Sequence, residues 1–158
     1  MRIGRHMEST PSPDSAAEAD AGLSALIRES WRRSTEAGLQ PDDRADGMVA
    51  ARSELTERLE ANARLIAYAQ PVIEHLHQQI ARSSSMVLLA DRDGMVLRAV
   101  GDSGFVERAS RISLTPGAVW SEQTMGTNAI GTALVEGRSV TVQGTEHYLA
   151  RKIGRAHV

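Results

Sequence analysis

The sequence contains no cysteine, which excludes disulfide bonds and thiolate chemistry. This absence is consistent with a reducing compartment, and we expect a cytoplasmic protein. Aromatic residues make up only 3% of the chain, so a core must be built mainly from aliphatic side chains. No apolar run approaches the roughly 20 residues that span a bilayer, which argues against a membrane protein. The net charge of −2 gives no electrostatic reason to expect nucleic-acid binding.

Lysine is almost absent as well, because Lys152 is the only one in the chain. A preference for arginine this strong indicates a GC-rich coding sequence. The last six residues, 153–158, match what a common short-read sequencing adapter encodes in one frame, and Lys152 stands at that junction. We therefore interpret 153–158 as read-through and exclude them from fold reasoning. The alternative is an ordinary polar tail.

The N-terminal part of the chain divides into two segments. Residues 1–20 carry prolines, serines and acids with almost no large apolar side chain, so we expect disorder, with translation starting at Met1 or Met7. Residues 21–47 are predicted to form an amphipathic helix and a linker, because Gly38 and the following proline end the helical pattern. One face of that helix carries Leu23, Leu26, Ile27, Ser30, Trp31 and Ser34.

Residues 48–83 are predicted to form a long signalling and dimerisation helix. From Leu59 onward its apolar positions keep a seven-residue repeat with Asn62 at one position, as in a two-stranded coiled coil where a buried Asn sets the register. Pro71 should kink or split the helix. Packing of the same face on the chain's own sheet is an equal alternative. The predicted dimer seam consists of Leu59, Ile66, Ala69, Ile73, Leu76 and Ile80.

From residue 84 the apolar pattern changes from helical to strand-like. Helices followed by a hairpin and a crossing helix indicate an α+β fold, in which an antiparallel sheet is flanked by helices. We assign residues 84–152 to this sheet domain. The predicted elements are strands over 86–90 and 95–100 joined by a turn in which Gly94 supplies positive φ, helices over 105–110 and 128–136, and a strand over 139–143.

The stretch 115–148 carries the candidate chemistry. Gly126 and Gly131 stand five apart, but a nucleotide-binding loop needs a lysine where Thr132 stands, so that function is rejected. Thr127 or Asn128 can instead cap a helix whose free N–H groups hold a carbonyl, carboxylate or phosphate of a small ligand. Plain capping is the alternative. Within that helix Gly131 costs about 1 kcal/mol relative to Ala, which indicates close packing or ligand approach.

Catalysis and metal binding have little support. Glu146 and His147 are adjacent, so on a strand they point to opposite faces and do not form a dyad. His75 and His77 lie two apart on a helix, on different faces, which makes them poor metal ligands. We therefore expect no catalytic residues, no metal site, no cofactor and no enzymatic activity.

The run GAVWSEQTMGTNAIGTALVEG at 117–137, followed by VTVQGTEHY, resembles the sensory GAF domain of the acetoin- and glycerol-catabolism regulators. These are sigma-54-dependent, Fis-family transcriptional activators. The resemblance extends upstream to an I-x-x-S-W-x-R signature beginning at Ile27 and to a G-L-x-P signature beginning at Gly38. It covers about residues 25–150 and includes several separated motifs in order.

The resemblance implies a signal-sensing GAF region, incomplete at its last strands, that controls an AAA+ ATPase and a helix-turn-helix absent from this chain. A small metabolite, such as a hydroxyketone or polyol, or a partner protein would bind its pocket. We expect a homodimer or higher oligomer, with DNA contact only through the missing domain and no membrane contact. The alternative is an interaction or dimerisation module in which the motif is purely structural. The residues expected to line the pocket or order its lid are Trp120, Glu122, Thr127, Asn128 and His147.

Overall fold

A computed structural model describes residues 24–43, 48–81 and 83–149. The predicted disorder over 1–20 and the predicted read-through over 153–158 lie outside these residues. The helices are α2 (Ala25–Glu36), α3 (Arg52–Ala61), α4 (Ala63–Ile80), α5 (Ser103–Ser110), α6 (Glu122–Met125) and α7 (Ala129–Glu136); the strands are β1 (Met86–Ala90) and β2 (Val96–Gly101), and η1 (Gly144–Glu146) is a 3-10 turn.

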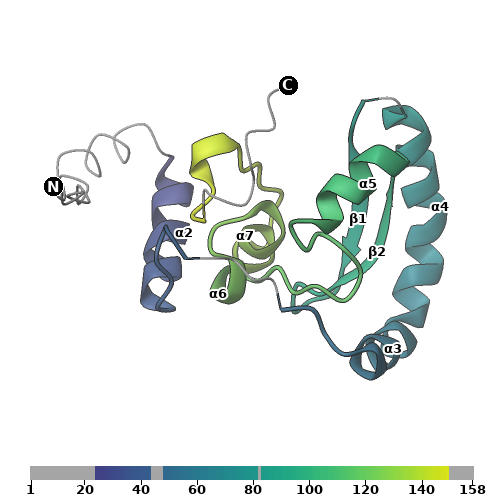
Figure 1. Ribbon diagram of the computed structural model, residues 1–158, viewed down its shortest axis with the longest axis horizontal. Coiled ribbons are helices and arrows are strands. Elements are labelled where there is room, and N and C mark those ends of the chain that lie inside the picture. Colours follow the sequence, from purple (N-terminus) through teal and green to yellow (C-terminus); the bar gives the residue numbers. More distant parts are fainter. Residues whose placement is uncertain (1–23, 44–47, 82, 150–158) are drawn as a thin grey trace, which may run out of the picture.

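A two-stranded antiparallel hairpin, β1 and β2, forms the centre of one half of the molecule. In its turn, the Asp91 carboxylate accepts hydrogen bonds from the backbone N–H groups of Asp93 and Met95, and Gly94 has the predicted positive φ of 84°. Helix α4 packs on both strands and α5 packs on β2, so the hairpin lies between these helices (Figure 1). Helices α2, α6 and α7 form the other half (Figure 1). The α+β fold class is confirmed.

The helix predicted over 48–83 is two helices, α3 and α4. Helix α3 ends at Asn62, where the backbone leaves the helical region with φ −103° and ψ 14°. The backbone N–H and the side-chain Nδ2 of Asn62 both donate to the carbonyl of Arg58, at 3.0 Å and 2.9 Å. Helix α4 runs through Pro71, where a break was predicted. The segment before α3 is extended instead of helical, and Val49 forms an antiparallel bridge with Ala118.

Much of the predicted dimer seam faces the chain's own hairpin. Ile73 is only 5% exposed on the helix that packs on the sheet. Leu59 and Ile66 line a groove of about 660 Å³ together with Ala99 and Val100 of β2. Within a single chain, Ile73 therefore packs toward the sheet, whereas Leu59 and Ile66 border the groove and Leu76 is 41% exposed. Dimerisation through the seam stays a prediction.

The strand predicted over 139–143 does not form in the part of the chain that the structure describes. A strand is stabilised by a neighbouring strand, and the described residues supply none beside this segment. The chain turns at η1 instead, where the Glu146 carboxylate accepts a hydrogen bond from the backbone N–H of Gln143 at 2.8 Å. Glu146 and His147 therefore lie at a turn and not on the opposite faces of a strand, as was predicted.

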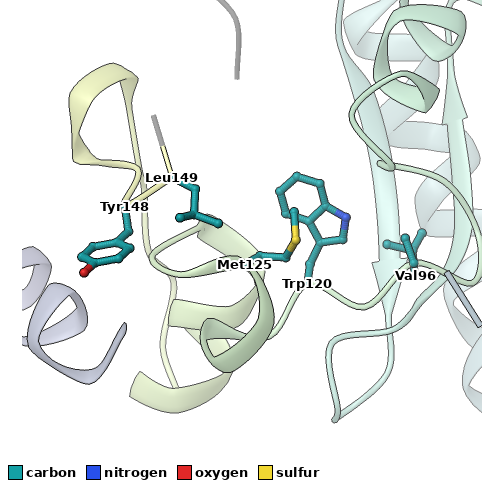
Figure 2. Packing of buried hydrophobic residues seen from close by; sticks show 6 residues of the cluster. Val96, Trp120, Met125, Tyr148 and Leu149 are labelled. Carbon is teal, nitrogen blue, oxygen red and sulfur yellow. The ribbon is translucent and has the colours of Figure 1, made fainter. Parts of the chain in front are cut away.

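The hydrophobic core joins the two halves. Figure 2 shows Trp120 beside Met125, with Val96 on the hairpin side and Tyr148 and Leu149 on the other. The Trp120 ring is 5% exposed, and its Nε1 donates to the carbonyl of Ser113 at 3.1 Å. Because the indole N–H is satisfied, the ring can be buried without an unpaired polar atom. The buried cluster consists of Val96, Ala118, Trp120, Met125, Tyr148 and Leu149.

Candidate functional site

Helix α2 buries two hydroxyl groups on an otherwise apolar face. The helix begins where the Ser24 hydroxyl accepts a hydrogen bond from the backbone N–H of Ile27. Ile27, Ser30 and Ser34 are spaced three and four residues apart and are each at most 2% exposed. Buried hydroxyls need hydrogen-bond partners. For Ser30 these partners lie about a hundred residues further along the chain.

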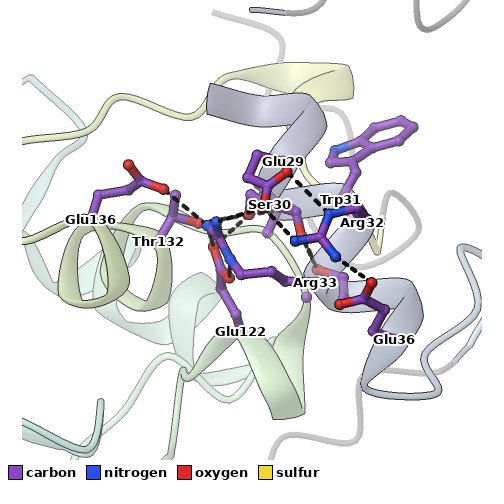
Figure 3. Close-up of polar contacts among 12 residues, drawn as sticks. Glu29, Ser30, Trp31, Arg32, Arg33, Glu36, Glu122, Thr132 and Glu136 are labelled. Atoms are coloured by element: carbon purple, nitrogen blue, oxygen red, sulfur yellow. Dashed lines mark hydrogen bonds and ion pairs between the residues drawn. The ribbon is translucent and has the colours of Figure 1, made fainter. Parts of the chain in front are cut away.

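The Glu122 carboxylate lies at the centre of this polar cluster (Figure 3). Its Oε1 accepts a hydrogen bond from the Ser30 hydroxyl at 2.5 Å. Arg33 donates through Nε to Oε2 at 2.7 Å and through Nη2 to Oε1 at 3.0 Å, which makes a bidentate pair. The same Nη2 lies 3.1 Å from Oε1 of Glu136. Arg33 therefore ties α2 to both α6 and α7.

The neighbouring hydroxyls extend this cluster. Ser30 has one hydroxyl proton and donates it to Glu122, so the Thr127 hydroxyl at 2.7 Å donates to Ser30. The Thr132 hydroxyl lies 3.2 Å from Ser30 and also hydrogen-bonds to Glu122. The Thr132 oxygen in turn accepts the backbone N–H of Asn128 at 3.3 Å. We call Ser30, Arg33, Glu122, Thr127 and Thr132 the α2 clasp.

Electrostatics favour the ionised form of Glu122. Burial alone would raise the pKa of this carboxyl group. Hydrogen bonds from Arg33 and Ser30, together with the positive charge of Arg33, outweigh burial and hold the pKa of Glu122 below its usual value of 4.5. The α2 clasp is therefore a charged and almost fully satisfied cluster at neutral pH.

The N-terminus of α7 is capped by the protein itself. Asn128 Oδ1 accepts the backbone N–H of Gly131 at 2.9 Å, and Asn128 Nδ2 donates to the carbonyl of Gly126 at 2.8 Å. A Cβ on Gly131 would lie 2.6 Å from the backbone N of Glu122 and 2.7 Å from the carbonyl O of Trp120. Close packing therefore explains Gly131, and plain capping is what the structure shows at Asn128.

His147 belongs to a separate set of contacts. Its Nδ1 lies 3.1 Å from the carbonyl oxygen of Gly144, and burial lowers the pKa of the imidazole. Helix α2 holds this segment too, because Trp31 Nε1 donates to the carbonyl of Glu146 at 2.8 Å and its ring packs edge-to-face on Tyr148. One helix thus contacts both the clasp and the 144–148 turn.

An open cavity of about 750 Å³ adjoins the clasp. Arg33 and Glu122 form part of its wall, so these two clasp residues face both the interior and the cavity. Leu134 and Val135 lie at the cavity and are 42% and 55% exposed. Of the five predicted ligand residues only Glu122 lines this cavity. The full lining is Arg33, Glu36, Ala37, Arg92, Asp93, Val119, Ser121, Glu122, Gln123, Thr124, Gly131, Leu134 and Val135.

Sequence reasoning assigned no site role to Ser30, Arg33 or Thr132. The sequence did indicate a buried polar contact at Ser30, since Ser30 and Ser34 share the predicted buried face of a helix with Ile27. Within residues 24–43, 48–81 and 83–149, no group of three or more His, Asp or Glu residues is placed to hold a metal ion. The helices described in these ranges are also too short or too polar to cross a membrane.

Comparison with known proteins places the chain in a family. A family model described as "MimR, N-terminal domain" matches residues 6–157. The chain belongs to this family. A MimR N-terminal domain is a regulatory domain of transcriptional activators. The prediction that this chain is the N-terminal region of such an activator is therefore confirmed.

Two proteins with sequences similar to this chain are transcriptional activators. The acetoin dehydrogenase operon transcriptional activator AcoR of Bacillus subtilis is 37% identical over 82% of this chain and 21% of its own length. The propane 2-monooxygenase operon transcriptional activator MimR of Mycolicibacterium smegmatis is 33% identical over 89% of this chain and 23% of its own length. The chain thus spans about a quarter or less of these two proteins.

A solved structure shares the fold. The crystal structure of the E. coli DhaR(N)–DhaL complex superposes with a TM-score of 0.76 at 19% identity, over 80% of this chain and 43% of that one. At this identity the likeness concerns the fold alone, and it agrees with the α+β class.

Proposed function

We propose that this MimR N-terminal domain is the signal-input region of a bacterial transcriptional activator, and that the cavity beside the α2 clasp receives the signal. The observation that carries this proposal is the position of the Arg33–Glu122 pair, which lines the cavity and also fastens α2. An occupant that hydrogen-bonds to either side chain competes with the pair. Occupancy then changes how firmly α2 is held, which is a population shift between two arrangements.

The chemistry of the cavity fits a small polar molecule with hydroxyl or carbonyl groups, such as a hydroxyketone or polyol. Ser121 and Thr124 supply hydroxyls, Gln123 supplies an amide, and Leu134 and Val135 supply apolar contact. A few polar groups on a largely apolar surface are typical of small-molecule sites. The sensor is of GAF type in this proposal, and its output is a sigma-54-dependent AAA+ ATPase with a Fis-type DNA-binding domain, as the resemblance implies.

Titration calorimetry of the 158-residue chain with acetoin, glycerol and dihydroxyacetone tests this proposal. We expect heat with at least one of them, and loss of that heat in Gln123→Ala, which removes an exposed cavity amide. The matched control is Gln78→Ala, which removes an exposed amide from α4 and should leave the heat unchanged. Heat that survives Gln123→Ala unchanged would place the ligand elsewhere.

A partner protein is the second candidate occupant. It is favoured by the exposure of Leu134 and Val135 at the cavity, because exposed neighbouring aliphatic side chains often mark protein contacts. In this case the polar residues at the start of α7 are structural, as the capping by Asn128 indicates. No heat with any of the three compounds, together with reporter activation that depends on Leu134 and Val135 but not on Gln123, would support a partner instead.

A further inference from the structure

A second groove of about 660 Å³ lies on the hairpin half of the molecule, away from the clasp. One wall comes from α3 and α4, where Leu59, Ala63 and Ile66 recur every three or four residues. The other wall comes from β2, which α4 contacts (Figure 1). We call this space the β2 groove. Its full lining is Leu59, Ala63, Ile66, Ala67, Gln70, Arg98, Ala99 and Val100.

The β2 groove follows one edge of the strand. Arg98, Ala99 and Val100 are consecutive, and successive residues of a strand point to opposite faces. A groove that all three residues line therefore runs along an edge of the strand and not over a single face. Strand β1 pairs with the opposite edge of β2 and contributes no residue to the lining.

This edge of β2 is paired only at its beginning. The backbone N–H of Val96 donates to the carbonyl of Ala118 at 2.9 Å, and the carbonyl of Val96 accepts the N–H of Gly117 at 2.8 Å. Among residues 24–43, 48–81 and 83–149, no strand continues beside 98–100 on this side. An edge of this kind is where an extended peptide adds to a sheet through main-chain hydrogen bonds.

The dimensions of the β2 groove fit a short extended segment. Ala63 and Gln70 are seven residues apart, which is about 10 Å along a helix. Three residues of an extended chain cover the same length at ~3.3 Å each, and three residues of β2 line the groove. Ala63 and Ala67 have small side chains, so a peptide backbone has room between β2 and α4.

The charge of the β2 groove indicates an acidic occupant. Arg98 is exposed and is the only charged residue of the lining. Within the part of the chain that the structure describes, no residue forms a hydrogen bond or ion pair with its guanidinium group. Gln70, the other polar residue of the lining, already donates to the Glu74 carboxylate at 2.7 Å. A carboxylate on the occupant supplies the charge-assisted hydrogen bonds that Arg98 lacks.

We propose that the β2 groove binds an extended segment of a partner protein, which adds as a strand beside 98–100 and places an acidic side chain at Arg98. Side chains that stand level on neighbouring strands share a face of the sheet. The acidic residue therefore lies beside Arg98, and an aliphatic residue next to it lies beside Ala99. The proposal does not depend on the occupant of the cavity beside the clasp.

Fluorescence anisotropy of the full chain with a labelled, end-capped peptide, Thr-Val-Glu-Val-Thr, tests this proposal. We expect saturable binding that weakens roughly tenfold at low salt in Arg98→Glu, because attraction becomes repulsion. The matched control is Arg52→Glu, which reverses another exposed arginine outside the groove and should leave the affinity unchanged. No saturation, equal weakening by both variants, or equal binding of a peptide with Lys in place of Glu would overturn the proposal.

Hydrogen exchange followed by NMR distinguishes strand addition from a contact made by Arg98 alone. We expect backbone amide exchange within 98–100 to slow when the peptide is bound, and exchange in α7 to stay unchanged. Ala67→Leu should weaken binding because the larger side chain occupies the groove, whereas Ala25→Leu, at an exposed position of α2, should not. Binding without slower exchange at 98–100, or with unchanged affinity in Ala67→Leu, would overturn strand addition.

Discussion

Replacing Glu122 by Gln should destabilise the domain through loss of one charge. The substitution keeps the size of the side chain but removes the negative partner of Arg33, whose Nε and Nη2 both donate to the carboxylate. Breaking a fully buried pair costs about 3–5 kcal/mol. Arg33 is 23% exposed and keeps its contact with Glu136, so part of this cost is recovered by solvent and by the second carboxylate. We expect a loss of about 2–3 kcal/mol in the free energy of unfolding.

Urea unfolding followed by tryptophan fluorescence measures this loss, and for a chain of this size each kcal/mol lowers the Tm by about 2–4 °C. The matched control is Glu107→Gln, which removes a carboxylate from the exposed pair with Arg111. That change should cost less than about 1 kcal/mol. If Glu122→Gln falls within about 0.5 kcal/mol of the control, the clasp does not hold α2 as argued.

Three further predictions concern the same region. Gly131→Ala should lower the free energy of unfolding by about 1–3 kcal/mol, because the new Cβ would lie 2.6 Å from a backbone atom. The control Gly104→Ala in α5 should be neutral or stabilising, since the nearest atom to its Cβ is an arginine Nη1 at 3.8 Å. Equal unfolding midpoints for the two variants would contradict this prediction. Asn128→Ala should cost about 1–2 kcal/mol in the same assay through loss of the cap, and an unchanged midpoint would count against it. Finally, because the pKa of Glu122 is lowered, its contribution to stability is complete above pH 4.5 and is lost as the pH falls through the folded-state pKa. The difference in free energy of unfolding between wild type and Glu122→Gln should therefore narrow in acid. A difference that grows in acid would contradict the lowered pKa.

Elements defined by neighbouring residues were predictable from the sequence. The hairpin followed from two apolar runs around Gly94, and the start of α7 followed from Asn128 before an apolar helix. Helix α2 followed from the spacing of Ile27 and its neighbours. In each case the decisive interactions span four residues or fewer, which a linear pattern records directly.

Features that depend on distant partners were not predictable. Ser30 and Glu122 are 92 positions apart, and nothing local shows that a serine hydroxyl meets that carboxylate. The strand over 139–143 has the right residue types, but strand formation is decided by a partner. Asn62 fits both a coiled-coil seam and a helix end, and only the observed backbone angles at Asn62 separate the two.

The buried face of α4 illustrates a different ambiguity. This helix has apolar residues around more than half of its circumference, including both an exposed side with Tyr68 and Val72 and the side that contains Ile73. A periodic pattern does not show which of these sides packs on the rest of the chain. The fold is needed to show which side the chain covers by itself.

The way in which α2 is attached has a consequence for local stability. Its long-range contacts described above, from Ser30, Trp31 and Arg33, are all made by side chains, and none belongs to a strand ladder. Opening of α2 therefore leaves the hairpin pairing intact, and its free energy lies below that of global unfolding. The amide protons of α2 should then exchange with solvent together, as one cooperative unit, before those of β1 and β2. We therefore expect local opening of α2 that does not require unfolding of the hairpin half.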